Sequence, residues 1–349
     1  MTAWLKRRRA LVIATALAVA FPFLVSVLID HQSLGAVTSN AQGNARFLQG
    51  LAIEIIILAI YAISYDLILG VTGLLSFGHA MFFAVGAYTF GIVIKSFGFG
   101  LVGALVAVVV ASILQALLFA VIVPRVKGIA YGLVTLGIAS MFWIVIQSTD
   151  LQKYAGAEIG LQGVEPPAPF LDTTGHRFAF YLVCVAVLLV VYIIYSRIVD
   201  APMGRVLVAA RENEDRAQML GYRTFWFKLV ALLVASLTAA LAGVLHTLHQ
   251  PITTPNIAGL GFTVTALLII LIGGVGTLSG AIIGAAIYRL LQFYLDKWFP
   301  GVSDLLIGIA YILVVLYLPY GVVGTWRARA LDITRGRKRL ISLVTRSRV

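Results

Sequence analysis

Four ionisable side chains lie within or beside long apolar runs, and they are the first candidates for chemistry. They are Glu54, Asp66, His79 and Arg289. An ionisable group is costly at membrane depth, so such a residue is a functional candidate by default. The first three lie within about two helical turns of the end of an apolar run, where water can solvate them. Two roles therefore remain open for these three residues, structural anchoring and direct contact with a solute.

The histidines form no recognisable catalytic or metal-binding pattern. His79, His246 and His249 lack the ligand spacing of a zinc site, so we expect no catalytic and no metal-binding residues. The sequence also lacks a G-x-x-x-x-G-K-[ST] loop, which a chain that binds nucleotide phosphates would use. If ATP supplies energy to this protein, another subunit must hydrolyse it. We therefore expect neither enzyme activity nor a bound cofactor on this chain.

Two glycine-rich stretches resemble each other and add candidate residues. "GVTGLLS" spans residues 70–76 and "GGVGTLS" spans residues 273–279, and both read G-x-x-G-x-L-S. An internal duplication would be parallel, since an even number of spans separates the two stretches, and chance similarity is the alternative. We expect these turns to flank a translocation pathway, with the candidate residues Gly73, Ser76, His79, Gly276 and Ser279.

The composition places these residues in a membrane protein. Of the 349 residues 61% are hydrophobic and 11% are charged, whereas a soluble domain is about 45–50% apolar and about 25% charged. The net charge of +12 resides in segments between apolar runs and at the termini, a pattern that argues against a nucleic-acid partner. The single cysteine, Cys184, lies in an apolar run, where packing is its expected role.

Apolar runs long enough to cross a bilayer predict an all-α, polytopic integral membrane protein with about ten transmembrane helices (8–10). Along the chain, connecting segments rich in Lys and Arg alternate with segments that have few of them. Because Lys and Arg are retained on the cytoplasmic side, this alternation predicts that both termini are cytoplasmic. The eighth and ninth runs are short. An alternative interpretation is that they form a broken or re-entrant pair of helices that do not each cross the membrane. In another alternative the first run belongs to a cleaved signal peptide. The ten runs lie near residues 10–29, 51–69, 77–95, 101–123, 129–147, 178–196, 228–249, 262–275, 280–296 and 304–320.

One short charged stretch interrupts the apolar sequence on the predicted cytoplasmic side. "RENEDRAQMLGYRTFWFK" spans residues 211–228. Helix-forming residues predict one helix from about Arg205 to Leu220, ended by Gly221. Its apolar stripe comprises Leu207, Ala210, Ala217 and Leu220. We expect this helix to lie along the membrane and to offer charge to a partner.

Several segments resemble one family of membrane proteins, in the order in which that family has them. "PMGRVLVAARENEDRAQMLGYRTFWFKLVAL" is similar to the cytoplasmic coupling segment of permeases in the branched-chain amino acid ABC importers. "LLSFGHAMFFAVGAYTFGIV", "KGIAYGLVTLGIASMFWIV", "LIGGVGTLSGAIIGAA" and "LVVLYLPYGVVG" are similar as well. The resemblance covers about residues 50–325 and is closest to the LivM-like permease type.

This resemblance implies a permease transmembrane domain over 46–325, with a coupling segment at about 203–225. Residues 1–45, with a basic segment and the first helix, and the basic tail 326–349 flank it. The family's ATPase contact maps onto Glu212, Glu214, Arg216, Ala217 and Gly221, and we expect Ala217 to enter a cleft of the ATPase.

The implied assembly lies in the bacterial inner (plasma) membrane. Its other members are a second permease subunit, which makes a heterodimer, two ATP-binding cassette ATPases that hold ATP and Mg, and an extracytoplasmic binding protein. The surrounding lipid is the remaining expected partner.

The expected function is import of branched-chain amino acids or related small polar solutes through a pathway of which this chain forms half. A urea, amide or aromatic-acid importer of the same family is the alternative. A stand-alone secondary transporter is a further alternative, but it would use acid–base pairs deep in the spans, and the sequence indicates none.

Overall fold

The computed structural model describes residues 15–24, 44–318 and 320–326. The predictions for the N-terminal basic segment, the positions of both termini and the basic C-terminal tail lie outside the described residues.

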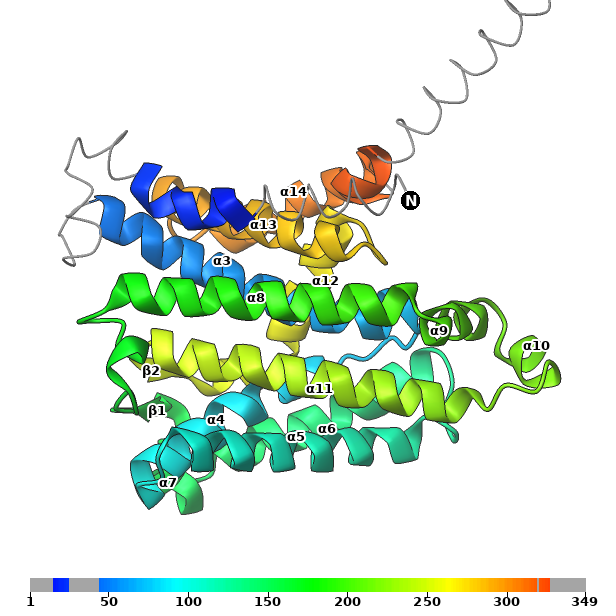
Figure 1. Ribbon diagram of the computed structural model, residues 1–349, viewed down its shortest axis with the longest axis horizontal. Coiled ribbons are helices and arrows are strands. Elements are labelled where there is room, and N and C mark those ends of the chain that lie inside the picture. The colour runs from blue at the N-terminus through cyan, green and yellow to red at the C-terminus, as the bar shows by residue number, and fades with distance from the viewer. Residues whose placement is uncertain (1–14, 25–43, 319, 327–349) are drawn as a thin grey trace, which may run out of the picture.

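Helices make up almost all of the described chain (Figure 1). The long helices are α3 (Asn44–Asp66), α4 (His79–Phe97), α5 (Leu101–Ile122), α6 (Ile129–Gln147), α8 (Arg177–Asp200), α11 (Thr224–His249), α12 (Leu260–Gly273), α13 (Leu278–Trp298) and α14 (Ser303–Tyr317). An apolar helix also covers Thr15–Leu24. Short elements join them: the π-helix η1 (Leu67–Val71), η2 (Thr149–Leu151), α7 (Gln152–Ala155), η3 (Ala157–Ile159), β1 (Leu161–Gln162), η4 (Pro169–Leu171), α9 (Pro202–Glu212), α10 (Glu214–Met219), β2 (Ile252–Thr253) and η5 (Pro255–Ala258).

The predicted fold class is confirmed, because the chain is an all-α polytopic membrane protein. Each of the ten apolar runs corresponds to a helix of the described residues. Seven of these helices are long and apolar enough to span a membrane, and the ninth run, now α13, is one of them. The helix at Thr15–Leu24, α12 and α14 are shorter, so the full count of about ten crossings stays a prediction.

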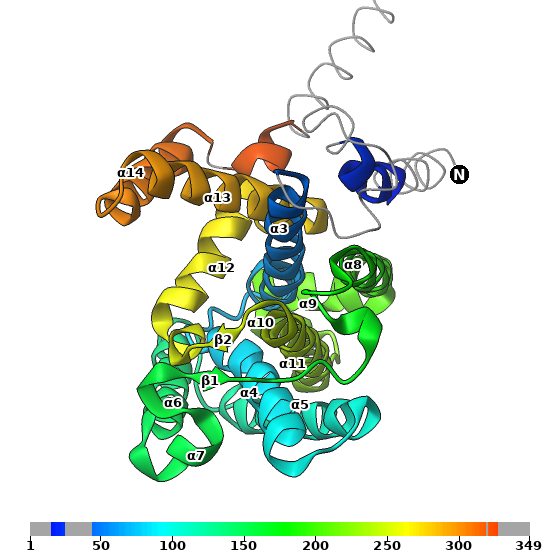
Figure 2. The ribbon, with the colours of Figure 1, turned by 90° about the vertical axis from the view of Figure 1, so that its left-hand side faces the viewer.

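Helix α11 lies at the centre of the bundle, against α3, α4 and α5 (Figure 2). Small residues permit this close packing. A Cβ atom at Gly86 of α4 would overlap the carbonyl oxygen of Ala240, and one at Gly243 of α11 would overlap the carbonyl oxygen of Phe83. Helices in lipid associate through close backbone approach, which explains the glycines at this crossing. The outward faces of α5 and α6 remain apolar and exposed, as a lipid-facing surface requires.

The connecting segments gather at two ends of the bundle, as the predicted alternation requires. At one end β1 pairs antiparallel with β2, Leu161 opposite Thr253. At the other end the Lys127 Nζ atom lies 3.3 Å from Asp215 Oδ1, which joins the α5–α6 turn to α10. Figure 1 shows β1 and β2 on the left and α9 and α10 on the right. From the charges of the loops we call these the outer and inner ends.

Glu54 lies near the outer end of its span, as predicted, since it follows the start of the candidate span at Arg46 by eight residues, or about two helical turns. Helix α3 begins at Asn44, so ten residues of helix precede Glu54, a rise of about 15 Å. The first turns of α3, with the sequence "NARFLQG", are polar and precede the apolar run. Asp66 is the last residue of α3, near the inner end as predicted.

Candidate functional site

Asp66 joins the two glycine turns at the inner end of the bundle. Its side chain is fully buried, and its Oδ1 atom accepts a hydrogen bond from the Gly276 N–H at 2.6 Å. The turns are close enough that a Cβ atom on Gly70 would lie 2.6 Å from the Gly276 nitrogen. Glycine at position 70 therefore permits the contact, and Asp66 has an anchoring role. The similar sequences at 70–76 and 273–279 form one packed unit, which we call the turn pair.

The two turns also share a backbone feature at the same place in their sequences. Gly73 and Gly276, each the second glycine of G-x-x-G-x-L-S, both have a φ of 74°. This left-handed region disfavours residues with a Cβ atom. Positive φ occurs at other glycine turns of this chain as well, so the internal duplication stays a prediction.

Arg211 connects the cytoplasmic helix α9 to the turn pair. Its Nη1 atom donates a hydrogen bond to the Gly70 carbonyl oxygen. Its stem covers Gly73, where an added Cβ atom would lie 3.1 Å from the Arg211 Cβ atom. Sequence analysis did not select Arg211, although it follows Leu207 by four residues and so shares the stripe that faces the bundle.

The segment predicted as one helix from Arg205 to Leu220 is two helices, so that prediction was wrong. The break is at Asn213, whose backbone is extended with φ −158° and ψ 100°. The Asn213 side chain accepts a hydrogen bond from the Arg216 N–H at 2.9 Å and so caps α10. The capping preference of asparagine outweighs helix propensity here, and α10 turns away from α9.

Glu214 fastens α10 to the start of α11. The Lys228 Nζ atom lies 2.6 Å from Glu214 Oε1, and the Thr224 hydroxyl donates to the same oxygen at 2.9 Å. Partial burial raises the pKa of the Glu214 carboxyl, but the hydrogen bond and charge of Lys228 lower it more, so the pKa lies below its ordinary value. Glu214, predicted to contact an ATPase, thus uses its carboxylate within this chain, and we assign it a positioning role.

Gly221 ends α10 as the sequence predicts. The Gly221 N–H bonds to the Gln218 carbonyl at 2.9 Å, and the Tyr222 N–H bonds to the Ala217 carbonyl at 3.3 Å. These two bonds and the left-handed φ of 88° at Gly221 make a Schellman motif. A side chain at this position would extend into open space. Gly221 therefore sets the direction of the chain after α10.

The surface of α10 differs from the predicted stripe. Ala217 is only 3% exposed within this chain, so the prediction that it enters a partner's cleft was wrong. Leu220, a member of the predicted apolar stripe, is 73% exposed, and its neighbour Met219 is 86% exposed. Glu212 and Arg216 are exposed as predicted. Met219, close to the helix-ending Gly221, is an exposed apolar residue that sequence analysis did not select, whereas Leu220 belongs to the predicted stripe.

The predicted pathway residues separate into a surface group and a buried group. Gly73 and Gly276 are exposed on the turn pair, and Ser279 is half-buried beside it. His79 and Ser76 are buried. The His79 Nε2 atom lies 2.9 Å from the Ser64 hydroxyl oxygen, and its ring packs against those of Tyr61, Tyr65 and Phe82. We assign His79 and Ser76 to packing, and the pathway role of the other three stays a prediction.

Within the described residues, no group of three or more His, Cys, Asp or Glu side chains is placed to hold a metal ion. The expectation that this chain binds no cofactor stays a prediction.

Comparison with known proteins gives one consistent group of relatives. The family model described as "Branched-chain amino acid transport system / permease component" matches residues 47–315. The chain is 26% identical over 341 residues to the high-affinity branched-chain amino acid transport system permease protein LivM of Escherichia coli (strain K12), covering 91% of this chain and 75% of the relative. No solved structure matches the chain significantly.

Two further relatives are permeases of other types. The permease protein LivH of the high-affinity branched-chain amino acid transport system of Salmonella typhimurium is 25% identical over 288 residues, covering 76% of this chain and 91% of the relative. The autoinducer 2 import system permease protein LsrC of Photorhabdus laumondii is 32% identical over 127 residues, covering 33% of this chain and 37% of the relative.

Proposed function

Because this chain belongs to the family of permease components of branched-chain amino acid transport systems, we propose that it forms half of the translocation pathway of an ATP-driven importer. A second permease subunit of the same family forms the other half. Two ATPase subunits bind the inner end, where they hold Mg and hydrolyse ATP, and an extracytoplasmic protein delivers the solute. The assembly lies in the bacterial inner membrane.

The contact between Arg211 and the turn pair is the observation that carries this proposal. An ATPase bound to α10 can move the membrane spans only through a rigid connection. Glu214 and Lys228 hold α10 to α11, and Arg211 holds α9 to the turn at Gly70. Asp66 then connects that turn to the one before α13. A displacement of α9 and α10 is therefore transmitted to the inner ends of four spans, α3, α4, α12 and α13.

The tip of α10 has the chemistry of a docking surface for the ATPase. Met219 and Leu220 are exposed apolar side chains at the inner end, and Glu212 and Arg216 add charge beside them. A short helix with apolar anchors and a charged rim is a common insert for a groove of a partner protein. This surface lies on the part of the bundle that projects furthest at the inner end (Figure 1).

Branched-chain amino acids are the solutes we favour, because the permeases similar to this chain over most of its length serve that transport. The alternatives are urea, amides and aromatic acids. A stand-alone secondary transporter remains a second candidate, because Glu54 and Arg289 form an ion pair within the spans. Sequence analysis did not find this pair, because its two members are 235 positions apart in the chain.

Purification of native partners tests the proposal. The full-length chain, tagged at one end, would be extracted from its native membranes in mild detergent. We expect a second permease and two ATP-binding subunits to copurify. Recovery of the chain alone from membranes that contain an active importer would contradict the proposal and favour the secondary transporter.

A further inference from the structure

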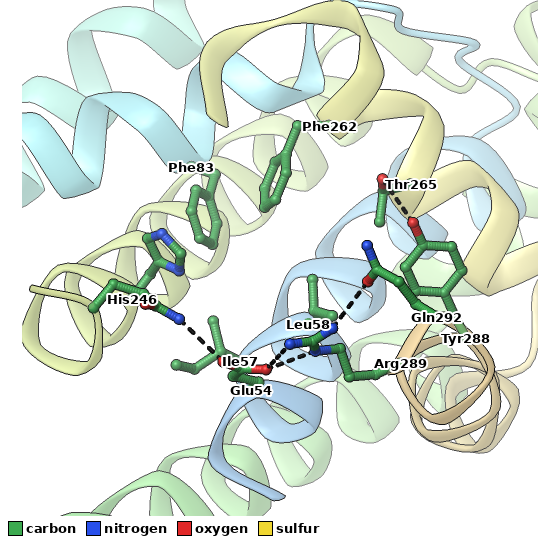
Figure 3. A pocket seen from close by; sticks show the side chains of 11 residues that line it. Glu54, Ile57, Leu58, Phe83, His246, Phe262, Thr265, Tyr288, Arg289 and Gln292 are labelled. Atoms are coloured by element: carbon green, nitrogen blue, oxygen red, sulfur yellow. Dashed lines mark hydrogen bonds and ion pairs between the residues drawn. The ribbon is translucent and has the colours of Figure 1, made fainter. Parts of the chain in front are cut away.

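A cavity of about 280 Å³ opens between the spans (Figure 3). Its walls come from five helices or their ends, namely α3, α4, α11, α12 and α13. Gln250, which follows α11 directly, lines the cavity, so it extends towards the outer end. Pockets for small ligands usually have about 300–1,000 Å³, which makes this cavity suitable for a small metabolite.

An ion pair lies on one side of the cavity. The Arg289 Nε atom donates to Glu54 Oε2 at 2.6 Å, and the Arg289 Nη2 atom contacts the same oxygen. Amide groups flank the pair on both sides. Gln250 Nε2 donates to Glu54 Oε1 at 3.0 Å, and Arg289 Nη1 donates to Gln292 Oε1 at 3.2 Å. The charged groups keep 22% and 24% of their side-chain surface exposed, so a solute in the cavity can reach both.

Apolar side chains line the other side of the cavity. Phe83 and Phe262 pack together with ring centroids 4.7 Å apart, and Ile57 and Leu58 lie on α3 beneath them. Tyr288 closes this side, and its hydroxyl lies 3.4 Å from that of Thr265. The cavity thus joins a pair of opposite charges to an apolar surface. Few ligand classes match both features.

We propose that this cavity is a binding site for a small zwitterionic solute that has an apolar side chain. Arg289 contacts the carboxylate of the solute, Glu54 contacts its ammonium group, and the aromatic side accepts its side chain. The guanidinium group has five N–H donors and can hold a carboxylate while it keeps a bond to Glu54.

Charge balance explains the preference for a zwitterion. In the empty site the charges of Glu54 and Arg289 compensate each other. The imidazoles of His246, which lines the cavity, and of His249, whose Nε2 atom lies 3.9 Å from Glu54 Oε1, carry no charge unless they are protonated. A zwitterion brings one charge of each sign, so every charge in the filled site still has an opposite partner. A solute with a single net charge would leave one charge unpaired at membrane depth, which is strongly unfavourable. The permease itself therefore selects by charge, in addition to any selection by a binding protein.

This inference rests on the proposed function and deepens it, because it assigns the solute class favoured there to a site formed by particular residues of this chain. It does not depend on the ATPase contact at the inner end. The Glu54–Arg289 pair lies in the outer half of α3 and in the middle of α13, whereas Arg211 and Asp66 lie at the inner end.

Equilibrium binding of radiolabelled L-leucine to the full-length chain in native-lipid nanodiscs tests the site. We expect saturable binding that Glu54→Gln and Arg289→Gln each weaken by at least about 30-fold. The double variant E54Q/R289Q leaves no unpaired charge, so it should fold and assemble like the wild type and still fail to bind leucine. The matched controls Glu158→Gln and Arg125→Gln, which lie in exposed segments away from the cavity, should bind normally.

Competition by two analogues of leucine separates charge selection from simple apolar binding. Leucine methyl ester carries a positive charge, and 4-methyl-2-oxopentanoate carries a negative one. Each should compete at least about tenfold more weakly than L-leucine, and equal competition would overturn the proposal. Equal leucine binding by the wild type and the double variant, or no saturable binding by the wild type, would also overturn it. Failure to recover ATPase subunits would contradict the proposed function, while leucine binding that is lost in E54Q/R289Q would still support this site.

Discussion

At the scale of single residues, a few polar side chains determine how the inner end is connected. Arg211, Asp66 and Glu214 each bond to a segment distant in sequence or to another helix. Glu212 and Arg216 are exposed and available to a partner. Within this charged stretch, Arg211 and Glu214 therefore bond to other parts of the chain, whereas Glu212 and Arg216 are exposed to a partner.

Replacement of Arg211 by alanine should uncouple the ATPase from the membrane spans. The change removes the bond to the Gly70 carbonyl and the stem that covers Gly73. A hydrogen bond with a charged partner contributes about 1.5–3 kcal/mol, so we expect solute uptake to fall about tenfold or more. Basal ATP hydrolysis should persist in the reconstituted complex, while its stimulation by the loaded binding protein should be lost. Arg205→Ala, an exposed change on the same helix, is the control, and an equal loss in that variant would refute the specific role of Arg211.

The Glu214–Lys228 pair should stabilise the chain at neutral pH and lose this effect in acid. The pKa of Glu214 in the folded chain is depressed, so its stabilisation is fully present above the ordinary value, about 4.3, and disappears as pH falls through the lowered pKa. Glu214→Gln should therefore lower the thermal midpoint of the purified chain at pH 7, and the difference from the wild type should shrink below about pH 4. The exposed change Glu158→Gln serves as the control at each pH. A difference that stays constant down to strongly acidic pH would show that the pair does not stabilise α10 through charge.

At the scale of the helices, the α9–α10 unit depends on the backbone at two points, Asn213 and Gly221. Asn213 separates the two helices, and Gly221 reverses the chain into α11. The orientation of α10 relative to α9 and α11 therefore depends on the backbone conformation at Asn213 and Gly221. A side chain at Gly221 would disturb that conformation, because its φ is left-handed.

Substitutions at Gly221 should impair coupling in proportion to their backbone strain. An alanine in the left-handed region costs about 1–2 kcal/mol, and proline is excluded there because its φ is fixed near −65°. Stimulated ATP hydrolysis should fall moderately in Gly221→Ala and be lost in Gly221→Pro, with both proteins present in the membrane. Gly98→Ala is a matched control, since Gly98 ends α4 at the outer end with a φ of 65° and open space around it. That variant should lose a similar amount of stability and keep its stimulation; full stimulation in Gly221→Pro would contradict the role of this turn.

Sequence patterns predicted the helices well because hydrophobicity acts locally. Each apolar run corresponds to a helix, and Gly221 ends α10 as predicted. Local hydrophobicity could not predict contacts between residues that are far apart in the sequence. The bond between Asp66 and Gly276 joins residues 210 positions apart, and the pairing of Glu54 with Arg289 joins residues 235 positions apart. The break at Asn213 was missed because helix propensity alone predicts an unbroken helix. It takes no account of the Asn213 cap or of the bond between Lys228 and Glu214, which hold α10 as a separate helix.

At the scale of the whole molecule, the two ends of the bundle carry different chemistry. The inner end holds the turn pair and the exposed tip of α10, and the outer half holds the charged cavity. Helix α11 runs between these regions, from Lys228 beside α10 to His246 at the cavity. One span therefore contacts both the proposed ATPase interface and the proposed solute site.

We propose that an ATPase subunit binds this permease at α10, and photo-crosslinking from Met219 tests that contact. Met219 would be replaced by p-benzoylphenylalanine in the full-length chain and irradiated in native membranes, with Glu158 at the outer end as the comparison position. We predict a crosslink from position 219 to an ATP-binding subunit and none to that subunit from position 158. A crosslink to the ATP-binding subunit from position 158, or none from position 219, would show that the ATPase does not bind at α10.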